Sequence, residues 1–185
     1  MKAKSTDVAF TEISKEFAET FGYIRQDIAA IRRANLSLNY TSVLLICCAC
    51  DMLAWHKDVD DHEIFTSLLP DGEPYTSLGE KVFEAVRNGL AHRFRPNTIK
   101  IGNELWRFRF SWQHGSPVSV SRGKMNWLGL NTKYLEDRVT AQIDAYEREL
   151  QNSAPARLKF VEKGKKSISV VPCEAKGILA GLNSL

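Results

Sequence analysis

Three side chains with complementary chemistry lie within the short segment from Arg87 to His92. An imidazole such as that of His92 can take the proton from a ribose 2′-hydroxyl or protonate a leaving 5′-oxygen. The Arg87 guanidinium can donate two hydrogen bonds to the phosphate oxygens as negative charge accumulates there. Asn88 precedes His92 by four residues, so on a helix it lies about 40° away and could orient the ring. Arg87, Asn88 and His92 are therefore candidate catalytic residues for cleaving RNA without a metal ion.

A purely structural role for His92 is the open alternative. On an ideal helix Arg87 projects about 140° away from His92, which is the wrong side for one compact site. A helix distorted near Gly89, or a long Arg87 side chain that swings round, would bring the two together. His92 could instead lie at the edge of the core, because it shares a stripe with Leu78, Val82, Ala85 and Gly89.

Two helices have to position these residues. The motif helix is predicted to start at a capping box formed by Ser77 and Glu80, and to end near Phe94 because Pro96 follows Arg95. The helix before it, about 40–57, is apolar almost all round and should be the central, buried one. Asp51 interrupts this apolar helix, and a buried carboxylate is costly unless it is paired. Asp51 is therefore expected either to have a partner or to lie at a surface-facing edge.

The motif resembles that of the HEPN superfamily, whose members are α-helical bundles and in many cases metal-independent endoribonucleases. Their motif is an Arg, commonly followed by Asn, and then a His after a short spacer; Arg87, Asn88 and His92 match it one by one. The resemblance covers roughly residues 6–96, and the helix at 132–150 fits it as well. It implies RNA as the substrate, no cofactor, no metal, and a homodimer whose paired motifs line one cleft.

The same resemblance implies that the helix of Asp51 packs against the motif helix, so that Asp51 could support Arg87. Relatives that act as toxins in one toxin–antitoxin class carry, two residues after the His, a Tyr that a nucleotidyltransferase antitoxin modifies. Phe94 stands at that position and has no hydroxyl, so this mode of control is not expected here. The function implied is RNA cleavage in defence or as a toxin-like module. A catalytically silent module that binds RNA, a nucleotide or a protein regulator is the alternative.

The remaining helices complete a bundle. Apolar residues recur every three or four positions from Phe10 to Ile31, which predicts a long amphipathic helix over about 6–34. This stripe suits a core or a partner seam, so a structural helical dimerisation protein is a third interpretation. A short helix is predicted at about 60–69. A last helix follows over 132–150, capped by Asn131 or Thr132.

Alternating apolar residues predict β-hairpins over about 98–130, inserted in a domain that spans residues 1–154. Arg107 and Arg109 interleave there with aromatic residues, an arrangement that can bind RNA by stacking and phosphate contact. The alternative is that the aromatic residues pack one sheet face onto the helices.

The tail at 155–185 is predicted to form a basic β-hairpin about Lys163 and Gly164, because apolar residues alternate there too. Lys163, Lys165 and Lys166 are the candidate phosphate contacts in it. The sequence thus predicts a mainly α protein, a HEPN-like bundle with inserted β-hairpins and a basic hairpin tail.

Composition narrows the class of protein only a little. The chain has 185 residues, of which 44% are hydrophobic and 25% charged, and this excludes intrinsic disorder for its bulk. Its formal net charge of +3 neither requires nor excludes a polyanionic partner. No signal peptide and no membrane-spanning stretch are recognisable, so a cytoplasmic location is expected.

Three of the four cysteines lie together in an apolar run at positions 47, 48 and 50. Cys47 and Cys50 have the spacing of half a zinc site or of a redox pair. A structural zinc site needs four ligands, however, and no second pair with metal-ligand spacing accompanies them. We therefore expect buried, reduced thiols that pack in the core.

Overall fold

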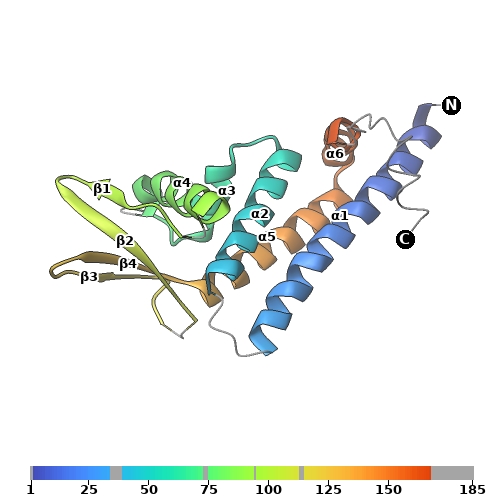
Figure 1. Ribbon diagram of the computed structural model, residues 1–185. Helices are drawn as coiled ribbons and strands as arrows, with labels where there is room; N and C mark the ends of the chain where they lie inside the picture. The colour runs from blue at the N-terminus through green and yellow to red at the C-terminus, as the bar shows by residue number, and fades with distance from the viewer. Residues whose placement is uncertain (1, 34–38, 73–74, 94, 113–114, 168–185) are drawn as a thin grey trace, which may run out of the picture.

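Six helices and four strands make up the described part of the chain (Figure 1). The computed structural model describes residues 2–33, 39–72, 75–93, 95–112 and 115–167, without the side chains of 2–7 and 165–167. The protein is mainly helical with one small sheet, as predicted. None of the described helices is long and apolar enough to cross a membrane. The elements are α1 (Lys2–Arg33), α2 (Asn39–Lys57), α3 (Asp61–Leu68), α4 (Tyr75–Arg93), β1 (Ile99–Ile101), β2 (Glu104–Ser111), β3 (Val118–Ser121), β4 (Asn126–Asn131), α5 (Thr132–Asn152) and α6 (Ala154–Ser167).

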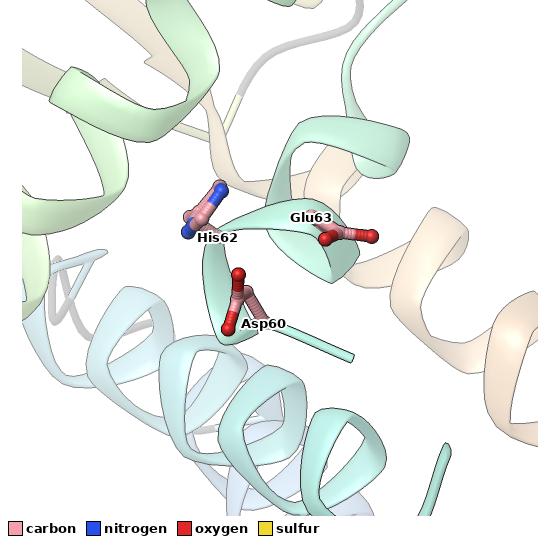
Figure 2. Close-up of side chains that lie close together, drawn as sticks. All are labelled: Asp60, His62 and Glu63. Atoms are coloured by element: carbon pink, nitrogen blue, oxygen red, sulfur yellow. The ribbon is translucent and has the colours of Figure 1, made fainter. Parts of the chain in front are cut away.

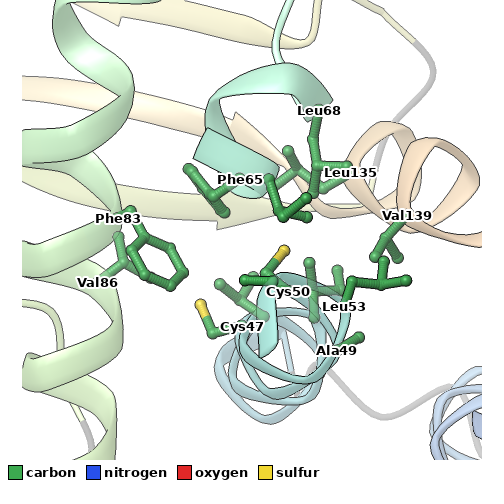
Figure 3. Close-up of a cluster of buried hydrophobic side chains, with 14 of the residues drawn as sticks. Cys47, Ala49, Cys50, Leu53, Phe65, Leu68, Phe83, Val86, Leu135 and Val139 are labelled. Atoms are coloured by element: carbon green, nitrogen blue, oxygen red, sulfur yellow. The ribbon is translucent and has the colours of Figure 1, made fainter. Parts of the chain in front are cut away.

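Helix α2 is the centre of the bundle, as its apolar composition predicts. Its buried side chains meet those of α3, α4 and α5 in one cluster, which Figure 3 shows around Cys47, Cys50 and Leu53. Phe65 and Phe83 pack against each other there with ring centroids 5.2 Å apart. Burying such side chains stabilises the fold by about 1.5–3 kcal/mol for each fully buried large one. The α2–α4 contact in this cluster fixes how the motif helix lies against Asp51.

The apolar stripe of α1 is used inside the chain itself. Ile13, Phe17, Phe21 and Ile28 are all buried in the common core. Of the two roles that the sequence allows for this stripe, core and partner seam, these residues take the core. Its apolar surface is already covered by the chain's own helices, chiefly α6 and α2.

The observed start of α5 agrees with the cap predicted from the sequence, whereas the observed start of α4 differs from it. Asn131 caps α5, where its side chain accepts a hydrogen bond from the backbone N–H of Tyr134 at 3.2 Å, as predicted. Helix α4 begins at Tyr75, however, two residues before the expected cap at Ser77. The backbone N–H of Tyr75 donates to the carbonyl of Gly72 at 3.0 Å, so the turn starts the helix earlier.

The two predicted strand pairs are present and join into one sheet of order β1-β2-β4-β3. β1 and β2 are antiparallel, as are β3 and β4, whereas the central pair β2 and β4 is parallel. Trp106 and Phe108 of β2 and Leu128 and Leu130 of β4 are buried on the face that meets the helices. The aromatic residues of this hairpin therefore pack onto the bundle, which confirms the structural alternative for them.

The basic tail does not form a hairpin where the structure describes it. Residues 154–167 form helix α6, and the expected second strand, around Ile168 and Val170, lies outside the described residues. Phe160 and Val161 are buried, and Phe160 lies within 5.9 Å of Phe10, ring centroid to centroid. Helix α6 thus packs against α1 and α2 within the helical bundle.

The cysteines are only partly as expected. Cys47 and Cys50 are buried in the core, but Cys48 is exposed on α2, which corrects the prediction of three buried thiols. Burial raises the pKa of all three thiols, and the Asp51 carboxylate adds to the effect. They therefore stay protonated at neutral pH. Cys173 lies outside the described residues.

His56 should make the stability of the fold depend on pH. It is 7% exposed, its ring stacks on Phe160 with centroids 4.7 Å apart, and burial lowers its pKa to about 4. The unfolded chain takes up this proton near pH 6.5, so acid favours the unfolded state. We expect stability to fall as the pH drops from about 6.5 to 4, by roughly 3 kcal/mol in all.

Urea unfolding at a series of pH values measures this effect. The matched control is His56→Gln, which keeps a neutral polar side chain that cannot be protonated. Its stability should fall less steeply over the same range. Equal slopes for the two proteins would contradict a buried, neutral His56.

Candidate functional site

Arg87 and Asp51 form an ion pair between the motif helix α4 and the central helix α2. The Nε of Arg87 donates to Oδ2 of Asp51 at 2.9 Å. The two side chains are 41% and 33% exposed, so the pair lies at the border between core and solvent. Of the two positions that the sequence left open for Asp51, it takes the one beside Arg87. The carboxylate fixes the inner edge of the guanidinium and leaves the outer edge toward solvent.

The charges around this pair keep Arg87 cationic. The hydrogen bond to Asp51 is the main cause that raises the pKa of Arg87. Burial raises the pKa of Asp51, and Asp61 at the start of α3 raises it further, while Arg87 acts in the opposite direction. Oδ1 of Asp51 is buried without a hydrogen-bond partner among the described residues. Burial thus disfavours the charged form of Asp51, and the hydrogen bond to Arg87 opposes that effect.

His92 lies in the last turn of α4 and is exposed. Within the described part of the chain its imidazole has no hydrogen-bond partner. It is therefore accessible to a substrate, and the alternative of a histidine at the edge of the core is wrong. Helix α4 continues through Gly89 without a break, so Arg87 and His92 stay about 140° apart around its axis. A single chain does not bring them to one point.

Asn88 associates with Arg87 and not with His92. Its Oδ1 accepts a hydrogen bond from Nη1 of Arg87 at 3.4 Å, a long and weak contact. Asn88 also lines a pocket of about 300 Å³ between α4 and β1. The expectation that Asn88 orients the imidazole is thus not met within one chain, although Asn88 stands between the two sides of the helix.

Gly89 has a different role from the helix distortion that the sequence suggested. The loop after α4 folds back over it, with the N–H of Asn97 donating to the carbonyl of Ala85 at 2.8 Å. A Cβ on Gly89 would lie 2.4 Å from the backbone nitrogen of Asn97 and 2.5 Å from the carbonyl oxygen of Arg95. Glycine at this position therefore lets the loop that follows His92 pack directly on the helix. Phe94, in between, lies outside the described residues.

The two hairpin arginines lie on the outer face of β2, away from the core. Arg107 and Arg109 are both exposed, and Arg109 stacks over the ring of Trp127 at 4.2 Å from its centroid. Arg107 and Trp127 are partners across the β2–β4 ladder, so they share this face. Both arginines are thus available to an anionic ligand.

The tail lysines fit the predicted RNA contact less well. Lys163 forms an ion pair with Asp58 at the end of α2, and its Nζ also lies 5.3 Å from the centroid of Trp55. Its charge is therefore near a carboxylate that Lys159 shares, and its contact with RNA stays a prediction. Lys165 and Lys166 belong to α6, but their side chains lie outside the described residues.

One group of possible metal ligands was not recognised from the sequence. Asp60, His62 and Glu63 lie at the start of α3, and one ligand atom from each falls within 4.8 Å of the others (Figure 2). The signal was present, since three potential ligands lie within four residues. Exposed acidic groups of this kind are common without an ion. These residues are not in contact with His92 in any interaction that the structure describes.

Comparison of the chain with models of known protein families, with curated proteins and with solved structures found no match.

Proposed function

We propose that the protein is a metal-independent endoribonuclease of the HEPN type. The observation that carries this proposal is the Arg87 guanidinium, which is held by Asp51 at Nε, makes only a long hydrogen bond to Asn88 among the other described residues, and is partly exposed on its outer edge. An exposed His92 on the same helix adds an acid–base group. Together these supply what cleavage needs when the nucleophile comes from the RNA itself. A role in defence or as a toxin-like module belongs to the same proposal.

In the proposed reaction His92 takes the proton from a ribose 2′-hydroxyl. The 2′-oxygen attacks the adjacent phosphorus, and the bond from phosphorus to the 5′-oxygen breaks. Water protonates the leaving 5′-oxygen, so the products are a 2′,3′-cyclic phosphate and a 5′-hydroxyl. The outer edge of Arg87 donates hydrogen bonds to the non-bridging oxygens, where the charge increases in the transition state. Asp51 is a positioning residue, because it acts through Arg87.

We further propose that the active cleft forms between two copies of the chain. Arg87 and His92 lie about 140° apart on one helix, so one copy presents them to different sides. A two-fold axis beside α4 would place Arg87 of one copy opposite His92 of the other, and each pair would occur twice. The exposed α2 face next to Asp51, with Cys48 and Trp55, is available for such a contact.

The same separation favours the second candidate function. If the chain acts as a monomer, Arg87 and His92 cannot act on one phosphate, and the motif would bind RNA, a nucleotide or a protein partner without cleaving. The two functions differ in a single measurable property, which is the appearance of cleaved RNA.

The test is cleavage of a short single-stranded RNA in EDTA. We expect cleavage to continue, because no step uses a metal ion, and we expect a 2′,3′-cyclic phosphate on the product. RNA with 2′-deoxyribose at the scissile position should stay intact, since it lacks the attacking hydroxyl. Loss of cleavage in EDTA that returns with added divalent cation would refute the proposal and direct attention to Asp60, His62 and Glu63.

A further inference from the structure

A pocket beside the last turn of α4 is lined by three arginines from different segments. Arg93 ends α4, Arg95 lies in the loop that follows, and Arg107 belongs to β2. The pocket has a volume of about 320 Å³, and none of the described residues that line it is acidic. All three arginines are exposed, and in the described part of the chain none of them forms an ion pair. Three unpaired cations around one hollow repel one another, and an anion would relieve that repulsion.

The walls of this pocket are held by backbone contacts. The loop with Arg95 packs on Gly89, and the hydrogen bond from Asn97 to Ala85 fixes it against α4. Arg107 is held in the β2–β4 ladder opposite Trp127. The backbone that carries the arginines is therefore already fixed by these contacts. A ligand would not have to fold or order it on binding. Such preorganisation lowers the cost of binding.

The remaining lining includes three aromatic rings, those of the buried Phe108 of β2, of Tyr40 at the start of α2 and of Trp127 of β4. Arg109 covers the Trp127 ring at 4.2 Å and adds a fourth cation close by. Guanidinium groups match phosphate oxygens in pairs, and aromatic rings stack on nucleobases. A pocket with both features suits a nucleotide better than it suits a phosphate or a phosphorylated peptide. Its volume is at the lower end of the range for small-ligand sites.

We infer that this pocket binds one nucleotide of single-stranded RNA, with its phosphate on Arg93, Arg95 and Arg107 and its base against Trp127 or Tyr40. This inference rests on the proposed function, since it makes the nucleotide a neighbour of the scissile phosphate. His92 is not among the residues that line the pocket, but it precedes Arg93 in the last turn of α4, so the pocket and the imidazole belong to the same end of the helix.

The test measures binding apart from cleavage. A fluorescein-labelled oligouridine with 2′-fluoro riboses cannot be cleaved through its 2′-position, and fluorescence anisotropy gives its Kd. The double variant Arg93→Ala/Arg95→Ala should weaken binding by roughly 10- to 100-fold. It should also lower the slope of log K against log salt by about 2. The matched control Arg33→Ala/Arg148→Ala removes the same charge from exposed positions on α1 and α5, and should change Kd by less than about threefold.

The base is tested separately. Trp127→Leu should weaken oligouridine binding about tenfold, and uridine monophosphate should compete better than inorganic pyrophosphate. The inference is overturned if the pocket variant binds like the control variant. It is also overturned if pyrophosphate competes as well as uridine monophosphate while Trp127→Leu has no effect, because the pocket would then be a phosphate site alone.

These experiments distinguish failure of the nucleotide-binding inference from failure of the proposed nuclease function. If the oligouridine binds at the arginines but cleavable RNA stays intact, the pocket stands and the nuclease proposal fails. If RNA is cleaved but the pocket variant binds and cleaves as the control does, the nuclease proposal stands and the pocket fails. Circular dichroism confirms that each variant is folded, which exposed arginines should allow.

Discussion

Replacing His92 with alanine should slow RNA cleavage by about 10²- to 10⁴-fold, the usual contribution of a positioned acid or base. Arg87→Ala should lose a comparable factor, because it removes the hydrogen bonds that strengthen as charge develops on the phosphate. His92 is exposed, so its truncation leaves no cavity, and the melting temperature should stay close to that of the wild type. Single-turnover cleavage of a labelled RNA measures the rate, and a thermal melt shows whether each variant is folded.

Arg148→Ala is the matched control for Arg87→Ala, since it removes an exposed arginine of α5 far along the chain from the motif. Its cleavage rate should equal that of the wild type. The catalytic assignment is falsified if His92→Ala remains folded and cleaves at the full rate. A large drop in melting temperature for His92→Ala would point instead to a structural role.

Mixing the two inactive variants tests the shared cleft. If Arg87 of one copy acts with His92 of the other, a mixed dimer keeps one intact pair. Equal amounts of Arg87→Ala and His92→Ala should then recover about a quarter of wild-type activity, because half the dimers are mixed and each holds one pair of two. No recovery, with mixed dimers shown to be present by light scattering and native mass spectrometry, would exclude a cleft built in this way.

The second large effect is expected at Gly89. An alanine Cβ would lie 2.4 Å from the backbone nitrogen of Asn97 and 2.6 Å from Cα of Pro96, and backbone cannot rotate out of the way as a side chain can. The loop must move off the helix, which also breaks the hydrogen bond from Asn97 to Ala85. We expect Gly89→Ala to lower the free energy of unfolding by about 1–3 kcal/mol, measured by urea denaturation. Arg95 should lose its position, so the affinity for oligouridine should fall as well.

Gly22→Ala is the matched control for this change. Gly22 is also inside a helix, but nothing lies within 4 Å of the Cβ that alanine would add. Alanine should therefore stabilise α1 by about 0.5–1 kcal/mol, through its higher helix propensity. Opposite signs for the same substitution would show that close packing of the loop, and not helix propensity, governs position 89. A stable Gly89→Ala variant with unchanged RNA affinity would contradict the described loop contact.

The sequence predicts those structural features that depend on residues close together in the chain, and it fails for features that depend on distant ones. The cap at Asn131 and the strand pairs β1–β2 and β3–β4 depend on neighbouring residues, and the structure agrees with all of them. The parallel pairing of β2 with β4 was not predictable in this way. It joins segments that are far apart in sequence and have no turn between them that could set the register.

The error at α6 has a definite cause. Leu158 and Phe160 alternate with polar residues, and a glycine follows, which is also the pattern of a hairpin. In the structure Leu158 is 52% exposed, while Phe160 and Val161 are buried. Gly164 makes no turn but lies against Ile13, where a Cβ would be 2.4 Å from that side chain. The same residues could form a hairpin or a helix, and the contact with α1 is what favours the helix.

For the candidate site, the sequence predicted which groups are present but not how they are directed. The pairing of Asp51 with Arg87 was one of two expectations. It rested on the helix packing that the family resemblance implies, together with the cost of an unpaired carboxylate in an apolar helix. The association of Asn88 with Arg87 could not be derived, because spacing alone allows either neighbour. The arginine pocket also escaped notice, since Arg93 and Arg107 come together only when the sheet folds back beside α4.

The position of α6 bears on how the chain folds while it is being made. The first apolar residues of α1 leave the ribosome early, but they are covered by Phe160 and its neighbours, which are added about 150 residues later. At ordinary rates of synthesis this interval lasts roughly 10–30 s. Throughout it the part of the α1 stripe that packs on α6 stays uncovered, although α2 emerges much earlier and covers another part. A newly made chain is therefore expected to rely on general chaperones until its last described helix has emerged, even though every helix it needs for the candidate site is complete before then.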